Sequence, residues 1–262
     1  MVRLLEDLTE LEKLALLPMS YSRLNNFKMC EAMYFYTSIA KEPSIFGEAA
    51  KMGNVIHSVL ENMLERNVPV DKMRTGEYYD EFLVQMNEHD PDGIISQNYI
   101  DIGIDIMQDF LDRHHGESFR IHEKELGFEV AIGGCLFRGY IDRVDMTKDT
   151  IYITDYKTGK NEVAQKWVHK DLQLGIYVLA VAALFPEFDK IYAELYYLKS
   201  GKQKGHLFTR DDLPTIESDL LELVSQVTTK RFFNETTNGR ICSFCDHAAS
   251  GACKVGARRV RR

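Results

Sequence analysis

The first third of the chain places apolar and polar residues with the period of an α-helix. Apolar side chains recur at positions i, i+3 and i+4 after Gly47, and a Pro-Asp-Gly break at residues 91–93 separates two further amphipathic segments. The predicted helices cover residues 47–67, 71–89 and 94–114. Before them, Thr9 and Ser22 stand where the N-caps of two more helices are expected. This part of the chain is therefore predicted to be helical.

The pattern changes near residue 119 to the alternation of β-strands. Three alternating segments are separated by short turn sequences, which predicts strands joined by tight turns. These strands cover residues 119–132, 135–146 and 150–160. A long helix is expected next, from about Glu162 to Leu184, followed by a hairpin over residues 191–210 and a helix over 214–229. The pattern predicts an α/β fold with a helical N-terminal part and a C-terminal lobe that carries cysteines.

Composition adds few restrictions. The chain has 262 residues, 45% of them hydrophobic and 27% charged, which is typical of a globular protein and excludes a disordered or collagen-like chain. We expect a single domain over residues 1–262. Its parts are a mainly helical segment at 1–116, a sheet core at 117–210 and a cysteine-bearing segment at 211–262. No apolar run reaches the roughly 18 to 20 residues of a membrane span, so a cytoplasmic protein without membrane contact is expected.

The most informative segment is the predicted strand that ends in Asp155-Tyr156-Lys157. Strand alternation directs Asp155 and Lys157 to one face. Asp142, on the preceding strand, would approach Asp155 on the same face, whereas Asp145 would face the other side. Two adjacent carboxylates repel each other unless a cation lies between them, and oxygen ligands suit Mg²⁺ or Mn²⁺. A lysine beside them could position a water or neutralise charge on a phosphate. The alternative is a structural ion pair at a strand end.

Three further patterns accompany this segment. Gly53 and His57 stand four residues apart on a predicted helix, and Gln173 and Tyr177 do so on the helix after the lysine strand. The third is a Ser-x-Leu-x-x-Phe-x-x-Cys series that ends at Cys30. Each pattern alone has low specificity, but their order spans residues 21 to 253.

In this combination the sequence resembles the PD-(D/E)xK nuclease superfamily, and more narrowly its RecB-like exonuclease and Cas4-like branch. The resemblance implies a restriction-endonuclease-like core, a mixed central sheet flanked by helices, that cleaves DNA with Mg²⁺ or Mn²⁺. The residues that it implies for metal binding are His57, Asp142, Asp155 and the carbonyl group of Tyr156. It implies catalytic roles for Asp142, Asp155, Lys157, Gln173 and Tyr177. Glu125 could support the site from the neighbouring strand, or be an ordinary solvated acid.

The cysteines form the second candidate site. Cys242 and Cys245 are a C-x₂-C pair and Cys253 follows, a spacing typical of metal ligands in an intracellular chain. Either Cys30 or His247 could supply a fourth ligand, the latter in a zinc site. The family resemblance favours Cys30, because one branch closes a [4Fe–4S] cluster with one early and three late cysteines. Cys135 is expected to be a small buried side chain in a strand.

The chain contains no Walker motif, so any unwinding of DNA would require a helicase or recombination partner. We expect a metal-dependent exonuclease acting on single-stranded DNA or DNA ends, in recombination, repair, phage replication or CRISPR adaptation, in a prokaryotic or phage-infected cell. The alternative is a non-catalytic or helicase-partnered subunit that binds DNA ends, stabilised by iron–sulfur or zinc. The aromatic runs at residues 34–36 and 196–197 could stack on bases, although such runs more often belong to a core.

Overall fold

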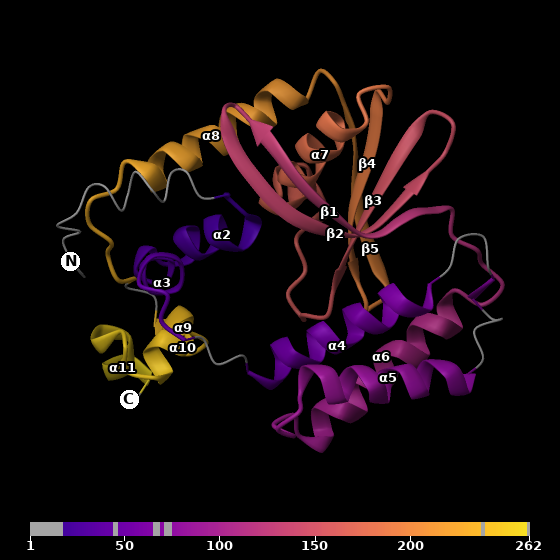
Figure 1. The fold of residues 1–262 in the computed structure, drawn as a ribbon, viewed down its shortest axis with the longest axis horizontal. Helices are drawn as coiled ribbons and strands as arrows, with labels where there is room; N and C mark the ends of the chain where they lie inside the picture. Colours follow the sequence, from indigo (N-terminus) through magenta and orange to yellow (C-terminus); the bar gives the residue numbers. More distant parts are fainter. Residues whose placement is uncertain (1–17, 44–46, 65–68, 71–74, 237–238, 261–262) are drawn as a thin grey trace. The chain divides into compact units, whose positions relative to one another are not determined.

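The computed structural model describes residues 18–43, 47–64, 69–70, 75–236 and 239–260 (Figure 1). Thr9 and the helix expected after it lie outside these residues. The described residues divide into two compact units. Unit 1 takes its residues from 18–43, 128–139 and 214–260, and unit 2 from 47–127 and 140–213.

Unit 2 contains most of the sheet and the helices nearest to it in sequence. Its helices are α4 (Glu48–Met63), α5 (Thr75–His89), α6 (Gln97–Arg113) and α7 (Leu172–Leu184). The strands are β1 (Ile121–Ile132), β2 (Cys135–Met146), β3 (Thr150–Lys157), β4 (Lys190–Tyr197) and β5 (Lys202–Thr209), although residues 128–139 of β1 and β2 belong to unit 1. The strands lie in the order β1-β2-β3-β4-β5. This sheet flanked by helices confirms the predicted α/β fold.

The sheet is mixed because β3 and β4 run parallel while β2–β3 and β4–β5 are antiparallel. A short 3₁₀ helix, η3 (Gln165–Lys170), and α7 provide the crossover that a parallel pair needs. The single helix predicted from Glu162 to Leu184 was therefore wrong. Asp171 has extended backbone and accepts hydrogen bonds from the amides of Gln173 and Leu174, so it caps a new helix instead of continuing an old one.

The two faces of the sheet have different partners within unit 2. Tyr156 and Tyr196 pack into a core formed with apolar residues of α4, α5 and α6, including Phe82 and Phe110. Alternation directs Asp155 and Lys157 to the opposite face. There α7 is buried from Gln173 to Val181, which explains why this helix is apolar on all sides.

Unit 1 collects segments that are distant in the sequence. Its helices are α2 (Tyr21–Met29), α3 (Glu31–Tyr34), the π-helical turn η1 (Phe35–Ile39), α8 (Leu213–Thr228), α9 (Gly239–Cys242), α10 (Asp246–Ala249) and α11 (Lys254–Val260). Ser20, and not Ser22, caps α2 by accepting a hydrogen bond from the amide of Arg23. Gly133 and Gly134 turn β1 into β2 with positive φ angles, and a side chain at Gly133 would collide with Leu221 of α8.

Candidate active site

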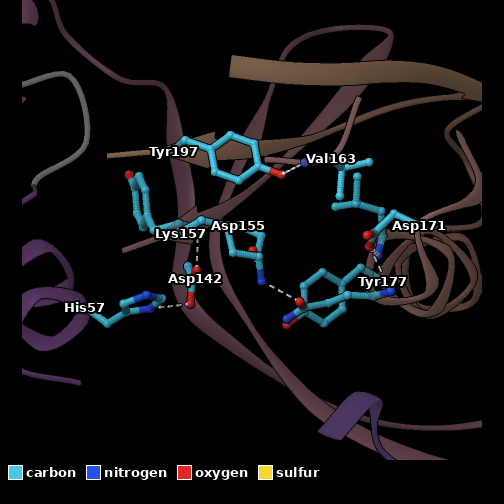
Figure 2. A network of polar contacts seen from close by, with 11 residues as sticks. His57, Asp142, Asp155, Lys157, Val163, Asp171, Tyr177 and Tyr197 are labelled. Carbon is cyan, nitrogen blue, oxygen red and sulfur yellow. Dashed lines mark hydrogen bonds and ion pairs between the residues drawn. The ribbon is translucent and has the colours of Figure 1, made fainter. Parts of the chain in front are cut away.

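His57, one of the predicted metal ligands, lies on α4 in unit 2. Its Nδ1 lies 3.1 Å from Asp142 Oδ1, as Figure 2 shows. Gly53 lies one helical turn earlier, and a Cβ there would lie 3.2 Å from the hydroxyl oxygen of Thr158. The glycine of the G-x-x-x-H pattern thus stands where α4 comes close to the end of β3, and a larger residue would require Thr158 to shift by a few tenths of an ångström. Burial opposes protonation of His57, but the carboxylates of Asp142 and Asp155 together outweigh it and raise the histidine pKa.

Asp142 lies where β2 and β3 separate. The ladder between these strands runs from Met146↔Ile151 to Arg143↔Thr154, one position short of Asp142 and Asp155. Beyond it, Asp142 Oδ2 accepts a hydrogen bond of 2.7 Å from the backbone amide of Tyr156. One carboxylate therefore holds both the end of β3 and the His57 ring, and it is the link between α4 and the sheet.

Asp155 and Lys157 start a chain of polar contacts that ends in α7. Lys157 Nζ lies 2.7 Å from Asp155 Oδ2 and donates a hydrogen bond of 2.6 Å to Gln173 Oε1. Gln173 Nε2 in turn donates to the hydroxyl group of Tyr177 at 2.8 Å. The spacing of four residues puts Gln173 and Tyr177 on one face of α7, and Figure 2 labels Lys157 and Tyr177 at the two ends of this series. The three predicted side chains Lys157, Gln173 and Tyr177 thus meet.

An open cleft of about 500 Å³ in unit 2 is lined by His57, Asp142, Asp155, Lys157 and Gln173, whereas Tyr177 lies behind Gln173 and is not among its lining residues. Asp155 is 2% exposed, and its burial together with the charge of Asp142 raises its pKa to about 6 even though Lys157 opposes the shift. A carboxylate that is desolvated beside a second carboxylate has too little positive charge around it at neutral pH. This is the electrostatic condition under which a divalent cation binds favourably, and carboxylate and carbonyl oxygens are the ligands that Mg²⁺ and Mn²⁺ prefer.

The described cleft residues nevertheless do not form a complete set of converging metal ligands. Within the described residues, no three histidine, cysteine, aspartate or glutamate side chains converge closely enough to hold an ion. Lys157 Nζ contacts Asp155 Oδ2. The donor set nevertheless fits a divalent cation in its chemistry, because it offers two carboxylates and a backbone carbonyl group.

Asp145 belongs to a different network, as its predicted face requires. It accepts a hydrogen bond of 2.7 Å from Arg143, which also donates to the hydroxyl group of Tyr156 at 2.7 Å. Thr154 and Glu194 extend this buried group. Asp145 is paired with a guanidinium, and this pairing explains why Asp142, and not Asp145, is available in the cleft.

The sequence did not point to every residue of the cleft. Glu61, one turn after His57 on α4, and Lys124 of β1 also line it, beside Glu125. Burial and the nearby Glu125 carboxylate raise the pKa of Glu61. Glu125 itself has a positive φ of 49°, which is unusual for a residue with a side chain. The i, i+4 spacing of His57 and Glu61 was the available sequence signal.

The cysteines gather in unit 1. Cys30 ends α2, Cys242 ends α9, Cys245 precedes α10 and Cys253 precedes α11; all four line one small cavity. Cys135 is not among its lining residues. Polar hydrogens point at the sulfurs. The amides of Thr236 and Gly256 donate to Cys30 and Cys253 at 3.3 Å, and Arg259 lies 3.9 Å from Cys242 Sγ. Such donors stabilise thiolate charge.

His247, the rival fourth ligand, also lines this cavity and is 3% exposed. Its Nε2 is 2.9 Å from the hydroxyl oxygen of Thr37, and its ring lies against Tyr36. Its Nδ1 is buried without a hydrogen-bond partner among the described residues. Both predicted ligand sets therefore have all their members at this cavity.

Comparison with known proteins agrees with this geometry. The model of the PD-(D/E)XK nuclease superfamily matches residues 18–252, so the chain belongs to this superfamily. Its members generally use divalent metals. The chain is 32% identical over 143 residues to the gene 69 protein of Mycobacterium phage D29 and 30% identical over 133 residues to that of Mycobacterium phage L5. These matches cover 50% and 47% of the chain, and 47% and 41% of the phage proteins, so it spans less than half of their length.

A crystal structure of a candidate exonuclease from Eubacterium rectale has a similar fold. The TM-score is 0.54 at 13% identity, over 94% of this chain and 93% of the other. At this identity the likeness concerns the fold. Across the described residues, no helix has the length and apolar character that a bilayer crossing requires.

Proposed function

We propose that this chain is a Mg²⁺- or Mn²⁺-dependent deoxyribonuclease that degrades DNA from its ends and carries a structural [4Fe–4S] cluster. The observation that supports this proposal is that Asp142, Asp155 and Lys157 line one cleft of a PD-(D/E)XK fold. DNA is the natural substrate class for this superfamily. A single nuclease domain with its cysteine-bearing segments remains our proposal for the organisation of the chain.

The site suggests a role for each side chain. Asp142 and Asp155 would hold the cation, with His57 and the Tyr156 carbonyl group beside them. Bound there, a divalent cation would polarise the phosphate and lower the pKa of an attacking water. Lys157 would orient that water or neutralise charge developing on the phosphate. Gln173 would keep the ammonium group in place through its 2.6 Å hydrogen bond, and Tyr177 would fix the orientation of the Gln173 amide.

The test of the proposed function compares end-labelled linear DNA with circular single-stranded DNA, with Mg²⁺ or Mn²⁺ and protein purified without oxygen. We expect linear DNA to be degraded and circles to survive. Cutting of circles would instead indicate an endonuclease. If folded, metal-supplied protein cuts neither, the alternative of a non-catalytic subunit that binds DNA ends, with or without a helicase partner, replaces the proposal.

The Lys157–Gln173–Tyr177 series gives a graded prediction. Gln173→Ala removes the acceptor for the Lys157 ammonium group and is expected to lower kcat about 10- to 100-fold with little change in KM. Tyr177→Phe removes only the hydroxyl acceptor of the Gln173 amide, so a fall of less than about tenfold is expected. Steady-state cleavage of a labelled oligonucleotide measures both. Equal activity of Gln173→Ala and the wild type would contradict the role of Gln173.

The cluster proposal is supported by the four cysteines at one cavity. All four line the same cavity, and four cysteine thiolates are the ligand set that a [4Fe–4S] cluster takes. Hydrogen-bond donors to three of the sulfurs also suit a cluster. Zinc bound by Cys242, Cys245, His247 and Cys253 is the alternative.

A further inference from the structure

The aromatic runs that the sequence suggested for base stacking are buried. Tyr34, Phe35 and Tyr36 are at most 7% exposed, and Tyr196 and Tyr197 are at most 3% exposed, so they belong to the core. Trp167, the single tryptophan of the chain, is instead 51% exposed and lies on η3. The indole is therefore accessible to a ligand, on a short helix between β3 and α7.

The surroundings of Trp167 are basic. Lys166 Nζ and Lys170 Nζ lie 5.3 and 5.8 Å from the centre of the indole ring, and both lysines are exposed. Within the described part of the chain, neither has an acidic side chain at ion-pair distance. The nearby Glu162 is already neutralised by Lys202 and Lys204, at 3.2 and 2.8 Å. A chain with a net charge of −8 thus carries local positive charge around an exposed aromatic ring.

The segment that bears Trp167 is held at both ends. The amide of Val163 donates to the Tyr197 hydroxyl group at 2.8 Å, and Gln165 donates to the carbonyl group of Gly205 at 2.8 Å. At the other end Asp171 caps α7, two residues before Gln173 of the cleft; Figure 2 shows both attachments. Val168, fully buried, anchors η3 between them. Because the backbone on both sides of Trp167 is held in this way, it loses little conformational entropy when the ring binds a ligand.

We propose that Trp167, Lys166 and Lys170 form a platform for single-stranded DNA, on which a base stacks on the indole while the two ammonium groups contact the flanking phosphates. This rests on the proposed nuclease function and names the form of its substrate. Unpaired bases expose a π-face for such stacking, whereas the bases of a duplex are already stacked on each other. The connection to Gln173 through Asp171 would set the distance between the stacked base and the phosphate in the cleft.

The single tryptophan makes the test direct. Wild-type protein in EDTA, where no cleavage occurs, is titrated with oligothymidylate, and the intrinsic fluorescence is recorded. Stacking predicts strong quenching that weakens with salt, and little quenching by blunt duplex DNA. Unchanged fluorescence at saturation, or equal quenching by the duplex, would overturn the proposal, since the site would then bind no base.

Variants separate stacking from folding. Trp167→Ala is expected to weaken binding of a labelled single strand about tenfold, and Trp167→Phe to keep it within about threefold. Lys166→Ala should make the binding constant less dependent on salt: the slope of its logarithm against the logarithm of the salt concentration should fall by the amount expected for about one phosphate contact. The control is Tyr79→Ala, which removes a 43% exposed ring from α5 and should bind as the wild type does. If Trp167→Ala binds the single strand with wild-type affinity, the proposed platform is refuted even if the protein cleaves DNA. If the strand quenches the fluorescence of the wild type but no divalent cation supports cleavage, the proposed nuclease function is refuted and the platform is retained.

Discussion

Asp155→Asn is expected to abolish DNA cleavage and to raise the thermal stability of the metal-free protein at the same time. The Asp155 side chain is 3% exposed and lies beside Asp142, so its negative charge is costly in the folded state. An amide has nearly the same shape but no charge, and it cannot replace a carboxylate as a ligand of Mg²⁺. We expect cleavage to fall at least about 1,000-fold. The two effects have one cause: the charge that binds the cation is the charge that destabilises the empty fold.

The pH dependence identifies the source of the stability gain. Asp155 has a pKa of about 6 in the folded protein against an ordinary value of 3.8. Its charge therefore lowers the free energy of unfolding by the full amount above pH 6 and has no effect on it below about pH 4, where the carboxyl group is protonated in both states. In EDTA, Asp155→Asn should therefore melt several degrees above the wild type at pH 8, a gain of up to about 3 kcal/mol. The gain should shrink as the pH falls from 6 to 4. Differential scanning calorimetry measures it.

A matched control for this substitution is Asp149→Asn in the turn between β2 and β3. That carboxylate is exposed and its pKa is lowered by its hydrogen bond with Lys190, so losing its charge brings no gain. Asp149→Asn should cleave DNA normally and melt no higher than the wild type. Normal cleavage by Asp155→Asn, or a loss of stability that is the same at pH 5 and pH 8, would contradict the assignment of Asp155.

Cys30→Ser is expected to remove iron from protein purified without oxygen and to lower its thermal midpoint by roughly 10 °C. Cys30 lies more than two hundred positions before its proposed fellow ligands, so the cluster would join segments that are far apart in the sequence. Iron analysis and visible absorption measure the cluster. Cys135→Ser is the matched control, because Cys135 lies in unit 1 on β2 and does not line the cysteine cavity.

His247→Gln distinguishes the two metal hypotheses. With an iron–sulfur cluster held by four cysteines, this variant should keep its iron while Cys30→Ser loses it. With zinc held by Cys242, Cys245, His247 and Cys253, the results are reversed: Cys30→Ser keeps the metal and His247→Gln loses it. Glutamine retains a polar group toward the hydroxyl of Thr37, which limits any simple folding defect.

Local periodicity predicted the first three strands well because each strand carries its own signal. β1, β2 and β3 begin and end within a few residues of the predicted segments, and Asp145 lies in a network apart from the cleft that Asp142 and Asp155 line, as alternation predicted. The division of residues 162–184 into η3 and α7 was missed. Apolar spacing continues across the break there, and the only local signal was Asp171, a good N-cap residue.

Contacts between segments that are distant in the sequence could not be predicted from local periodicity. The hydrogen bond from Lys157 to Gln173 depends on the crossover between β3 and β4, and the cavity of the cysteines depends on the approach of Cys30 to α9–α11. The family resemblance suggested the first grouping; for the second, the cysteine spacing left Cys30 and His247 open as the fourth ligand, and the resemblance favoured Cys30. The exposure of Trp167 had no sequence signal at all, because a six-residue 3₁₀ helix is too short to define a face.

The composition of unit 1 from three separate stretches of chain has a consequence for biosynthesis. By residue 213 the ribosome has made all of unit 2, including Asp142, Asp155, Lys157 and Gln173. Cys30 emerges early but meets Cys242, Cys245 and Cys253 only after residues 214–253 have left the exit tunnel. Iron delivery to these cysteines would thus follow the synthesis of every proposed cleft residue, and a message truncated shortly after codon 213 would encode all of those residues yet only one of the four proposed iron ligands.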